Sequence, residues 1–268
     1  TNESPSLIVK FKFDPNQERL NNLGQPSSVQ NGNAAQTPLF EKISAHYFEL
    51  SPLPTTLLGQ GEVLYHAPET NAGGVTAIDF SQAIVVGENE TFLKIPLKNI
   101  TPGSYSWVRV SLAYQRYGIQ LLAQGNELMG TLESFVGYNT YIKTHRIHQQ
   151  TFEVNANRRQ GYWAFALSQF NFGSSGLAPE GATTVPNPLF NTSPIPAGSC
   201  VVTGDFPSPL VITGNETKNI VVTLSLSINQ SFEWTEVVPD GKFEPGIGEQ
   251  VIDMGLRGLK PSYQVSGN

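Results

Sequence analysis

The sequence predicts an all-β protein, built as an antiparallel β-sandwich or a jelly-roll-like barrel with long loops and at most short helices. Apolar and polar residues alternate in many short runs, and no run keeps the 3.6-residue period of a helix. Clusters of Gly, Pro, Asn and Ser separate these runs at fairly regular spacing. Short strands of this kind are typical of sandwiches and barrels.

The clearest predicted strands lie near the two ends of the chain, at residues 7–13 and 220–228. In each, one face is apolar and the other is polar. The positions expected to face inward are Leu7, Val9, Phe11 and Phe13 in the first strand and Val222, Leu224, Leu226 and Ile228 in the second.

Further strands are expected at residues 44–50, 62–65, 77–80, 91–97, 104–115, 138–154, 161–170 and 210–212. In residues 104–115, Val108, Val110 and Leu112 fall on one face, so we expect a long strand with one buried side. Thr37 and Pro38 are favoured at a helix start and predict a single helical turn through Lys42. Residues 119–135 fit neither period.

We expect residues 1–6 to be a polar N-terminal tether and residues 7–268 to form a single domain, which is long enough to bury a large core. Residues 14–36 and 173–198 are rich in turn-forming residues and predict long loops, which often have binding functions.

The composition favours an extracellular or periplasmic protein. Only 14% of residues are charged, against about a quarter in an average soluble protein. The net charge of −6 argues against a nucleic-acid partner, because binding phosphates requires clustered Lys and Arg. The single cysteine, Cys200, excludes an internal disulfide and a multi-cysteine zinc site. The polar start of the chain resembles the tether of an exported protein, anchored to the outer membrane before trimming.

Residues 233–253 resemble a degenerate calcium loop. Such loops place oxygen ligands at positions 1, 3, 5, 7, 9 and 12 around a glycine at position 6. With Gly241 at position 6, the register gives Glu236, Val238, Asp240, the carbonyl of Lys242 and Glu244 as the first five ligand positions. Val238 has no ligand oxygen in its side chain, and the closing carboxylate, Glu249, arrives two residues late. The alternative is an acidic surface turn without metal, pinned to the sandwich by Phe243.

Two other binding sites are candidates. Trp107 and Tyr105 would stack against sugars if their rings were exposed, although aromatic rings in strands more often fill a core. His145 and His148 would bind copper only if the chain turned between them, because strand residues three apart point to opposite faces. His46 is expected to pack in or beside the sheet. We find no catalytic signature, and Glu49, Glu62, Glu69 and Asp79 are scattered carboxylates.

Four stretches resemble uncharacterised envelope lipoproteins of Gram-negative bacteria. They are residues 43–50 (ISAHYFEL), 77–80 (AIDF), 100–112 (ITPGSYSWVRVSL) and 170–176 (FNFGSSG). The same stretches more weakly resemble the methanobactin-binding periplasmic protein family, which is linked to copper. The paired cysteines of that family have no counterpart beside Cys200. The resemblance implies a secreted or lipid-anchored β-sandwich.

These observations lead to three functional hypotheses. The first is a non-enzymatic envelope binding protein for an unknown small molecule, glycan or envelope protein, with calcium as the candidate structural ion. The second is a carbohydrate-binding or carbohydrate-active protein. The third is a periplasmic copper-handling protein. In all three, contact with a membrane would come only through a lipid anchor at the N-terminus.

Overall fold

The computed structural model describes residues 4–21, 24–178, 193–254 and 256–266. It confirms the all-β fold: the only helices in these ranges are 3₁₀ turns of three residues. They are η1 (Phe80–Gln82), η2 (Leu97–Asn99), η3 (Ser168–Phe170) and η5 (Pro245–Ile247). None of the helices in the described part of the chain is long and apolar enough to cross a membrane.

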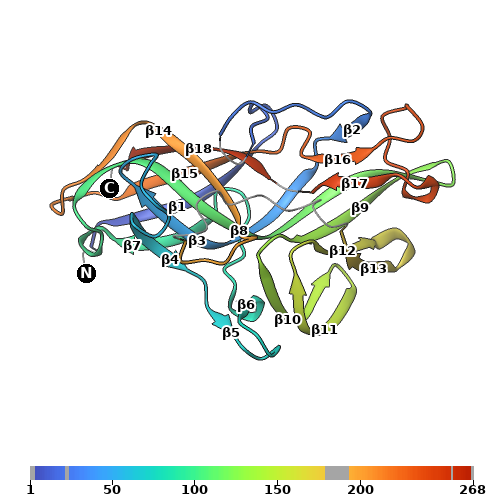
Figure 1. Cartoon of the computed structure of the whole chain (residues 1–268), viewed down its shortest axis with the longest axis horizontal. Coiled ribbons are helices and arrows are strands. Elements are labelled where there is room, and N and C mark those ends of the chain that lie inside the picture. Colours follow the sequence, from blue (N-terminus) through green and yellow to red (C-terminus); the bar gives the residue numbers. More distant parts are fainter. Residues whose placement is uncertain (1–3, 22–23, 179–192, 255, 267–268) are drawn as a thin grey trace.

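Two sheets make up the sandwich, which lies along the long axis of the molecule (Figure 1). One sheet has the order β18 (Arg257–Val265), β15 (Ile220–Ser227), β1 (Ser6–Asp14) and β7 (Thr91–Pro96). The other has the order β13 (Phe172–Leu177), β12 (Tyr162–Leu167), β9 (Asn126–Phe135), β8 (Gly103–Ala123), β3 (Leu39–Ser51) and β4 (Glu62–His66). Strand β14 (Cys200–Ile212) also pairs with β8 and packs beside β18, which links the two sheets.

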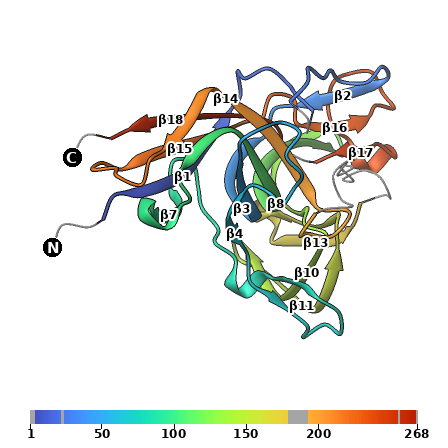
Figure 2. The same cartoon turned by 60° about the vertical axis from the view of Figure 1, so that its left-hand side comes forward.

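Two smaller sheets flank the sandwich. One contains β17 (Gln250–Asp253), β16 (Phe232–Thr235) and β2 (Asn33–Gln36). The other contains β11 (Gln150–Arg159), β10 (Asn139–Ile147), β6 (Ala77–Asp79) and β5 (Glu69–Thr70). The second small sheet extends from the underside of the sandwich in both views, and we call it the lower sheet (Figures 1 and 2).

The largest core lies between the two sandwich sheets, and the alternation predicted for β1 and β15 is confirmed. Val9 and Phe11 are fully buried, as are Val222 and Leu224. These two strands are neighbours but run parallel, with Leu7 opposite Ile220. The pairing of β10 with β6 is also parallel, whereas the other strand pairs are antiparallel.

Three predicted elements differ from the structure, and residues 119–135, which fit neither period, can now be assigned. The helical turn at Thr37–Lys42 is wrong, because β3 already starts at Leu39 and pairs with β8. Residues 138–154 form a hairpin that turns at His148, and residues 119–135 contain the turn from β8 to β9. The predicted loop at 173–198 begins with most of strand β13, while its residues 179–192 lie outside the described ranges.

Strand β8 is buried on both faces, whereas the sequence predicted one buried side. Arg109 and Ser111, on the face expected to be open, are 3% and 0% exposed. Pairing with β3 along one edge and with β14 and β9 along the other places β8 at the centre of its sheet. The polar residues Arg109 and Ser111 therefore lie on a second buried face of β8, and not on a face that is open to solvent.

The excursion after β1 is attached to the fold by a buried ion pair. Arg19 donates to Glu233 Oε2 over 2.5 Å, and Glu233 Oε1 accepts from Asn33 Nδ2 and from the Gln30 amide over 2.6 and 3.1 Å. Burial alone would raise the pKa of Glu233, but these hydrogen bonds outweigh it and hold the pKa below the ordinary value of 4.5. The stabilisation from ionised Glu233 is therefore present above pH 4.5 and is lost as the pH falls through the lower, folded-state value.

We accordingly expect Glu233→Gln to lower the free energy of unfolding by about 1–3 kcal/mol at pH 7, because charge-assisted hydrogen bonds are lost in a buried setting. The difference from the wild type should shrink as the pH falls below 4.5 and through the lowered folded-state pKa of Glu233, because protonation removes the charge in the wild type as well. Urea unfolding from pH 7 to pH 3 measures it. Glu18→Gln is the matched control, since Glu18 and its partner Lys260 are both more than half exposed. A difference that stays constant across this range would contradict the prediction.

Candidate metal centre

A β-bulge on β3 presents His46 away from the main core. Ala45 pairs with Leu112 and Tyr47 with Ser111, so His46 is an additional residue without a partner on β8. The positions that face the main core shift accordingly, from Ile43 and Ala45 before the bulge to Phe48 and Leu50 after it. The bulge thus directs the His46 side chain, which is fully buried, to the opposite face of the sheet.

The chain then brings His66 and Glu69 to the same place. His66 is the last residue of β4 and pairs with Tyr47. The next amide, of Ala67, donates to the carbonyl of His46 over 2.7 Å, which fixes the chain against the bulge. Pro68 follows, and Glu69 begins β5 of the lower sheet. Because the chain changes direction after β4, the side chains of His66 and Glu69, three residues apart, both point towards His46.

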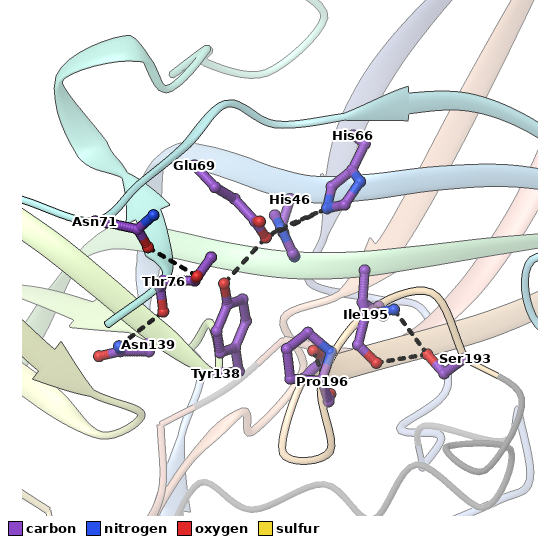
Figure 3. A network of polar contacts seen from close by, with 11 residues as sticks. His46, His66, Glu69, Asn71, Thr76, Tyr138, Asn139, Ser193, Ile195 and Pro196 are labelled. Atoms are coloured by element: carbon purple, nitrogen blue, oxygen red, sulfur yellow. Dashed lines mark hydrogen bonds and ion pairs between the residues drawn. The ribbon is translucent and has the colours of Figure 1, made fainter. Parts of the chain in front are cut away.

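Three donor atoms converge at this point, as Figure 3 shows. His46 Nε2 lies 3.0 Å from Glu69 Oε1 and 3.1 Å from His66 Nε2, and His66 Nε2 lies 3.4 Å from Glu69 Oε1. A tetrahedral ion with bonds of about 2.0–2.1 Å separates its ligand atoms by about 3.3 Å. The triangle formed by these atoms therefore has the size of one face of such a coordination shell.

No placement of hydrogen atoms on the two imidazole rings gives all three side chains good hydrogen bonds. If both Nε2 atoms carry hydrogen, two N–H groups meet over 3.1 Å, and His46 Nδ1 becomes a buried acceptor without a hydrogen-bond donor. If one nitrogen lacks hydrogen, its lone pair faces the Glu69 carboxylate or competes for one shared proton. A single cation at the centre would accept all three lone pairs at once.

Electrostatics keep the donors in the forms that bind metals. Burial, followed by repulsion from His66, lowers the pKa of His46 from 6.5 to about 4, so its imidazole is neutral at pH 7. Burial would raise the pKa of Glu69, but hydrogen bonds from Tyr138 and His46 lower it overall, and the carboxylate stays ionised. Neutral imidazole and carboxylate are the ligand forms of these residues.

Tyr138, which directly precedes β10 of the lower sheet, orients Glu69. Its hydroxyl donates to Glu69 Oε1 over 3.0 Å. The next residue, Asn139, starts β10 and donates to the carbonyl of Thr76 over 3.2 Å, and the Thr76 hydroxyl donates to Asn71 Oδ1 over 2.8 Å (Figure 3). These hydrogen bonds hold the segment after Glu69 against β10. The Glu69 carboxylate is therefore positioned both by its own backbone and by the Tyr138 hydroxyl.

Glu49 fixes β4 on the other side of His46. Its carboxylate is fully buried and accepts from Tyr47 Oη over 2.9 Å and from the amides of Gly59 and Gly61 over 3.0 and 2.7 Å. A Cβ atom at Gly61 would lie 2.4 Å from the carbonyl oxygen of Leu50, so only glycine fits there. The loop before β4 is thereby held against β3, and His66 is held against His46.

Comparisons with known proteins give no relative whose function could be related to this site. No family model matches the sequence, and no curated protein or solved structure is significantly similar to it. Functional arguments for this chain therefore depend on its own residues.

The residues of the degenerate calcium loop do not converge. Glu249 accepts from the amides of Val237 and Glu244, Glu236 from the amide of Gly241, and Asp240 from that of Lys242. The Lys242 side chain pairs with Glu127 over 2.6 Å. These carboxylates shape the turn, and among the described residues only His46, His66 and Glu69 form a group of three potential metal ligands. Phe243 packs as expected: it is buried in one cluster with Tyr117 and Ile119 of β8, and its ring lies 5.5 Å from that of Trp234.

Tyr105 and Trp107 do not form one sugar-stacking platform. Tyr105 is 6% exposed within the main core, and its hydroxyl donates to the carbonyl of Thr101 over 2.6 Å. Trp107 is half-buried and lies between Ser51 of β3 and Asp205 of β14. The burial of Tyr105 corrects its proposed stacking role, and leaves Trp107 alone.

His145 and His148 are separated by the turn of the hairpin and serve different contacts. His145 is buried, with Nδ1 2.6 Å from Glu133 Oε2 and Nε2 3.2 Å from Tyr162 Oη. His148 is exposed at the turn and its Nε2 lies 2.9 Å from the Thr131 hydroxyl. Both ring nitrogens of His145 are therefore occupied, and the geometry does not favour a copper site shared by this pair.

Proposed function

We propose that this protein is a non-enzymatic binding protein of the bacterial envelope that holds one zinc ion through His46, His66 and Glu69. The observation that carries the proposal is the triangle of three donor atoms, 3.0, 3.1 and 3.4 Å apart, contributed by two sheets. The envelope location is supported by the low share of charged residues, 14%, and by the many turn-forming residues. Fractionation of cells that produce the native protein tests the location.

The donor set favours zinc over calcium. Two imidazole nitrogens and one carboxylate are common ligands of zinc, whereas calcium takes six to eight oxygen ligands. Copper(II) is the second candidate, because imidazole suits copper as well and affinities of such sites for divalent metals rise towards copper. The copper hypothesis thus moves from His145 and His148 to His46 and His66.

Isothermal titration calorimetry of metal-free protein with zinc tests the proposal. We expect one zinc ion per chain, and a loss of affinity in His66→Ala that exceeds the roughly 10–100-fold typical of an outer-shell change. His66 is suited to this test because its side chain is 41% exposed, so its removal leaves the core intact. A parallel titration with copper(II) shows which of the two metals the site binds more tightly.

The control is His148→Asn, which removes an exposed histidine outside the site. Asn tolerates the positive φ of 51° at that turn, so the hairpin is retained. This variant should bind zinc as the wild type does. Equal zinc affinity in the wild type and His66→Ala, or absence of a stoichiometric site in the wild type, would refute the proposed function.

A further inference from the structure

The three-residue site has an accessible side. His46 is fully buried and forms the inner wall, whereas the side chains of His66 and Glu69 are 41% and 27% exposed. An ion bound by all three would thus contact protein on the His46 side and solvent on the other. Structural zinc sites are closed by four protein ligands, while sites with three protein ligands keep a position for water or an external ligand.

The charge of the loaded site would favour an anion. A divalent ion with two neutral imidazoles and one carboxylate retains a net positive charge, next to a buried wall where electrostatic interactions are stronger than in water. The chain neighbours of Glu69 and Tyr138 that Figure 3 labels, Asn71, Thr76 and Asn139, are uncharged hydrogen-bonding residues. They would not repel a bound anion.

Tyr138 lies beside the same oxygen that would bind the metal. Its hydroxyl is 3.0 Å from Glu69 Oε1, and its ring centroid is 5.4 Å from that of His46. A phenol has one O–H, so Tyr138 would turn its hydrogen bond from Glu69, whose charge the metal would then neutralise, to an oxygen bound at the adjacent coordination position. Its side chain is partly exposed, so it borders the open side of the site.

We infer that the fourth coordination position takes a small oxyanion, such as the carboxylate group of a small molecule, and that Tyr138 is the positioning residue for this ligand. The inference depends on the proposed metal site and extends it: the metal would be the means by which the protein captures its ligand. A carboxylate and a phosphate present the same oxygen chemistry to the metal, so both serve as probes.

Cobalt(II) substitution tests the inference, because the visible spectrum of cobalt responds to its ligands and zinc has no such spectrum. The cobalt-loaded protein is titrated with sodium acetate and with inorganic phosphate, and with sodium perchlorate at matched ionic strength. We expect a saturable spectral change with acetate, phosphate or both, and none with perchlorate. The anion that binds more tightly identifies the ligand class.

Tyr138→Phe is titrated in the same way at cobalt concentrations that saturate it. Its anion affinity should fall roughly tenfold, as expected for losing one charge-assisted hydrogen bond, while bound cobalt remains one per chain. His148→Asn should behave as the wild type. Unchanged anion affinity in Tyr138→Phe would overturn the role of Tyr138.

The other outcomes separate the two proposals. If cobalt binds but neither anion alters its spectrum, the coordination shell is closed to external ligands, and the inference fails while the metal site stands. If cobalt, zinc and copper all fail to bind, the proposed function fails and the inference fails with it.

Discussion

Replacing Glu133 by alanine is expected to lower the free energy of unfolding by about 3–5 kcal/mol, the cost of leaving a buried charge network without its central partner. Glu133 lies on β9 and is 1% exposed. It accepts hydrogen bonds from the Tyr114 hydroxyl and, over 3.0 and 2.7 Å, from Arg116. Its second oxygen lies 2.6 Å from His145 Nδ1. The variant would remove the carboxylate that these three buried or half-buried side chains share as a partner.

The loss should also loosen the lower sheet. His145 belongs to β10, and Arg116 on β8 donates to the carbonyl of Arg146 on the same strand over 2.8 Å. Glu133 therefore connects β8 and β9 of the sandwich with the sheet that contributes Glu69. We expect amide hydrogen exchange in β10 and β11 to accelerate more in Glu133→Ala than exchange in β1 and β15.

Urea unfolding at pH 7 measures the free-energy change, with Glu127→Ala as the control. Glu127 lies on the same strand, and its ion pair with Lys242 is exposed, with 67% and 49% of the two side chains accessible. Such surface pairs contribute about 0–1 kcal/mol. If Glu133→Ala were no more destabilising than Glu127→Ala, the network would not be holding the lower sheet to the sandwich.

The all-β fold could be predicted from the sequence because it depends on local alternation. The inward positions of β1 and β15 are set by side-chain period, and their burial follows once any second layer covers them. The helical turn at Thr37 failed for the opposite reason. Its capping signals were local, but pairing of Leu39 with Gly118 on β8 outweighs them.

The metal centre could not be predicted from spacing alone. His46 and His66 are far apart in the sequence, and their proximity follows from the pairing of β3 with β4 and from a bulge that leaves His46 without a partner on β8. The one local signal was His66-x-x-Glu69 with Pro68 between them. The rule that strand residues three apart diverge holds within a strand, and Pro68 ends the strand pairing before Glu69.

The spacing of acidic residues around Gly241 explains why the calcium interpretation was attractive. Acidic residues near Gly241 fit several positions of a ligand register, but backbone amides of a tight turn require the same oxygens. Gly241 and Gly248 have positive φ, of 73° and 94°, and in these turns the amide of Gly241 donates to Glu236 and that of Glu244 donates to Glu249. Carboxylates at turn spacing therefore indicate a turn before they indicate a metal.

Zinc should raise the melting temperature of this protein in a concentration-dependent manner, and the rise should be absent in His46→Ala. An ion that binds only the folded state stabilises it by about 2.7 kcal/mol when its free concentration is 100 times the Kd. A change of 1 kcal/mol shifts the melting temperature of a domain of 150–250 residues by about 2–4 °C, which gives a rise of roughly 5–11 °C here.

His46→Ala removes a fully buried side chain, so this variant should melt lower than the wild type even without zinc. The decisive quantity is therefore the difference between zinc-loaded and chelator-treated samples of each variant, measured by differential scanning calorimetry. Glu69→Gln keeps the size of the side chain and a hydrogen-bond acceptor for Tyr138 but removes the charge, so its zinc-dependent rise should be smaller than that of the wild type. A wild-type melting temperature that zinc leaves unchanged would mean that His46, His66 and Glu69 are held together by hydrogen bonds alone.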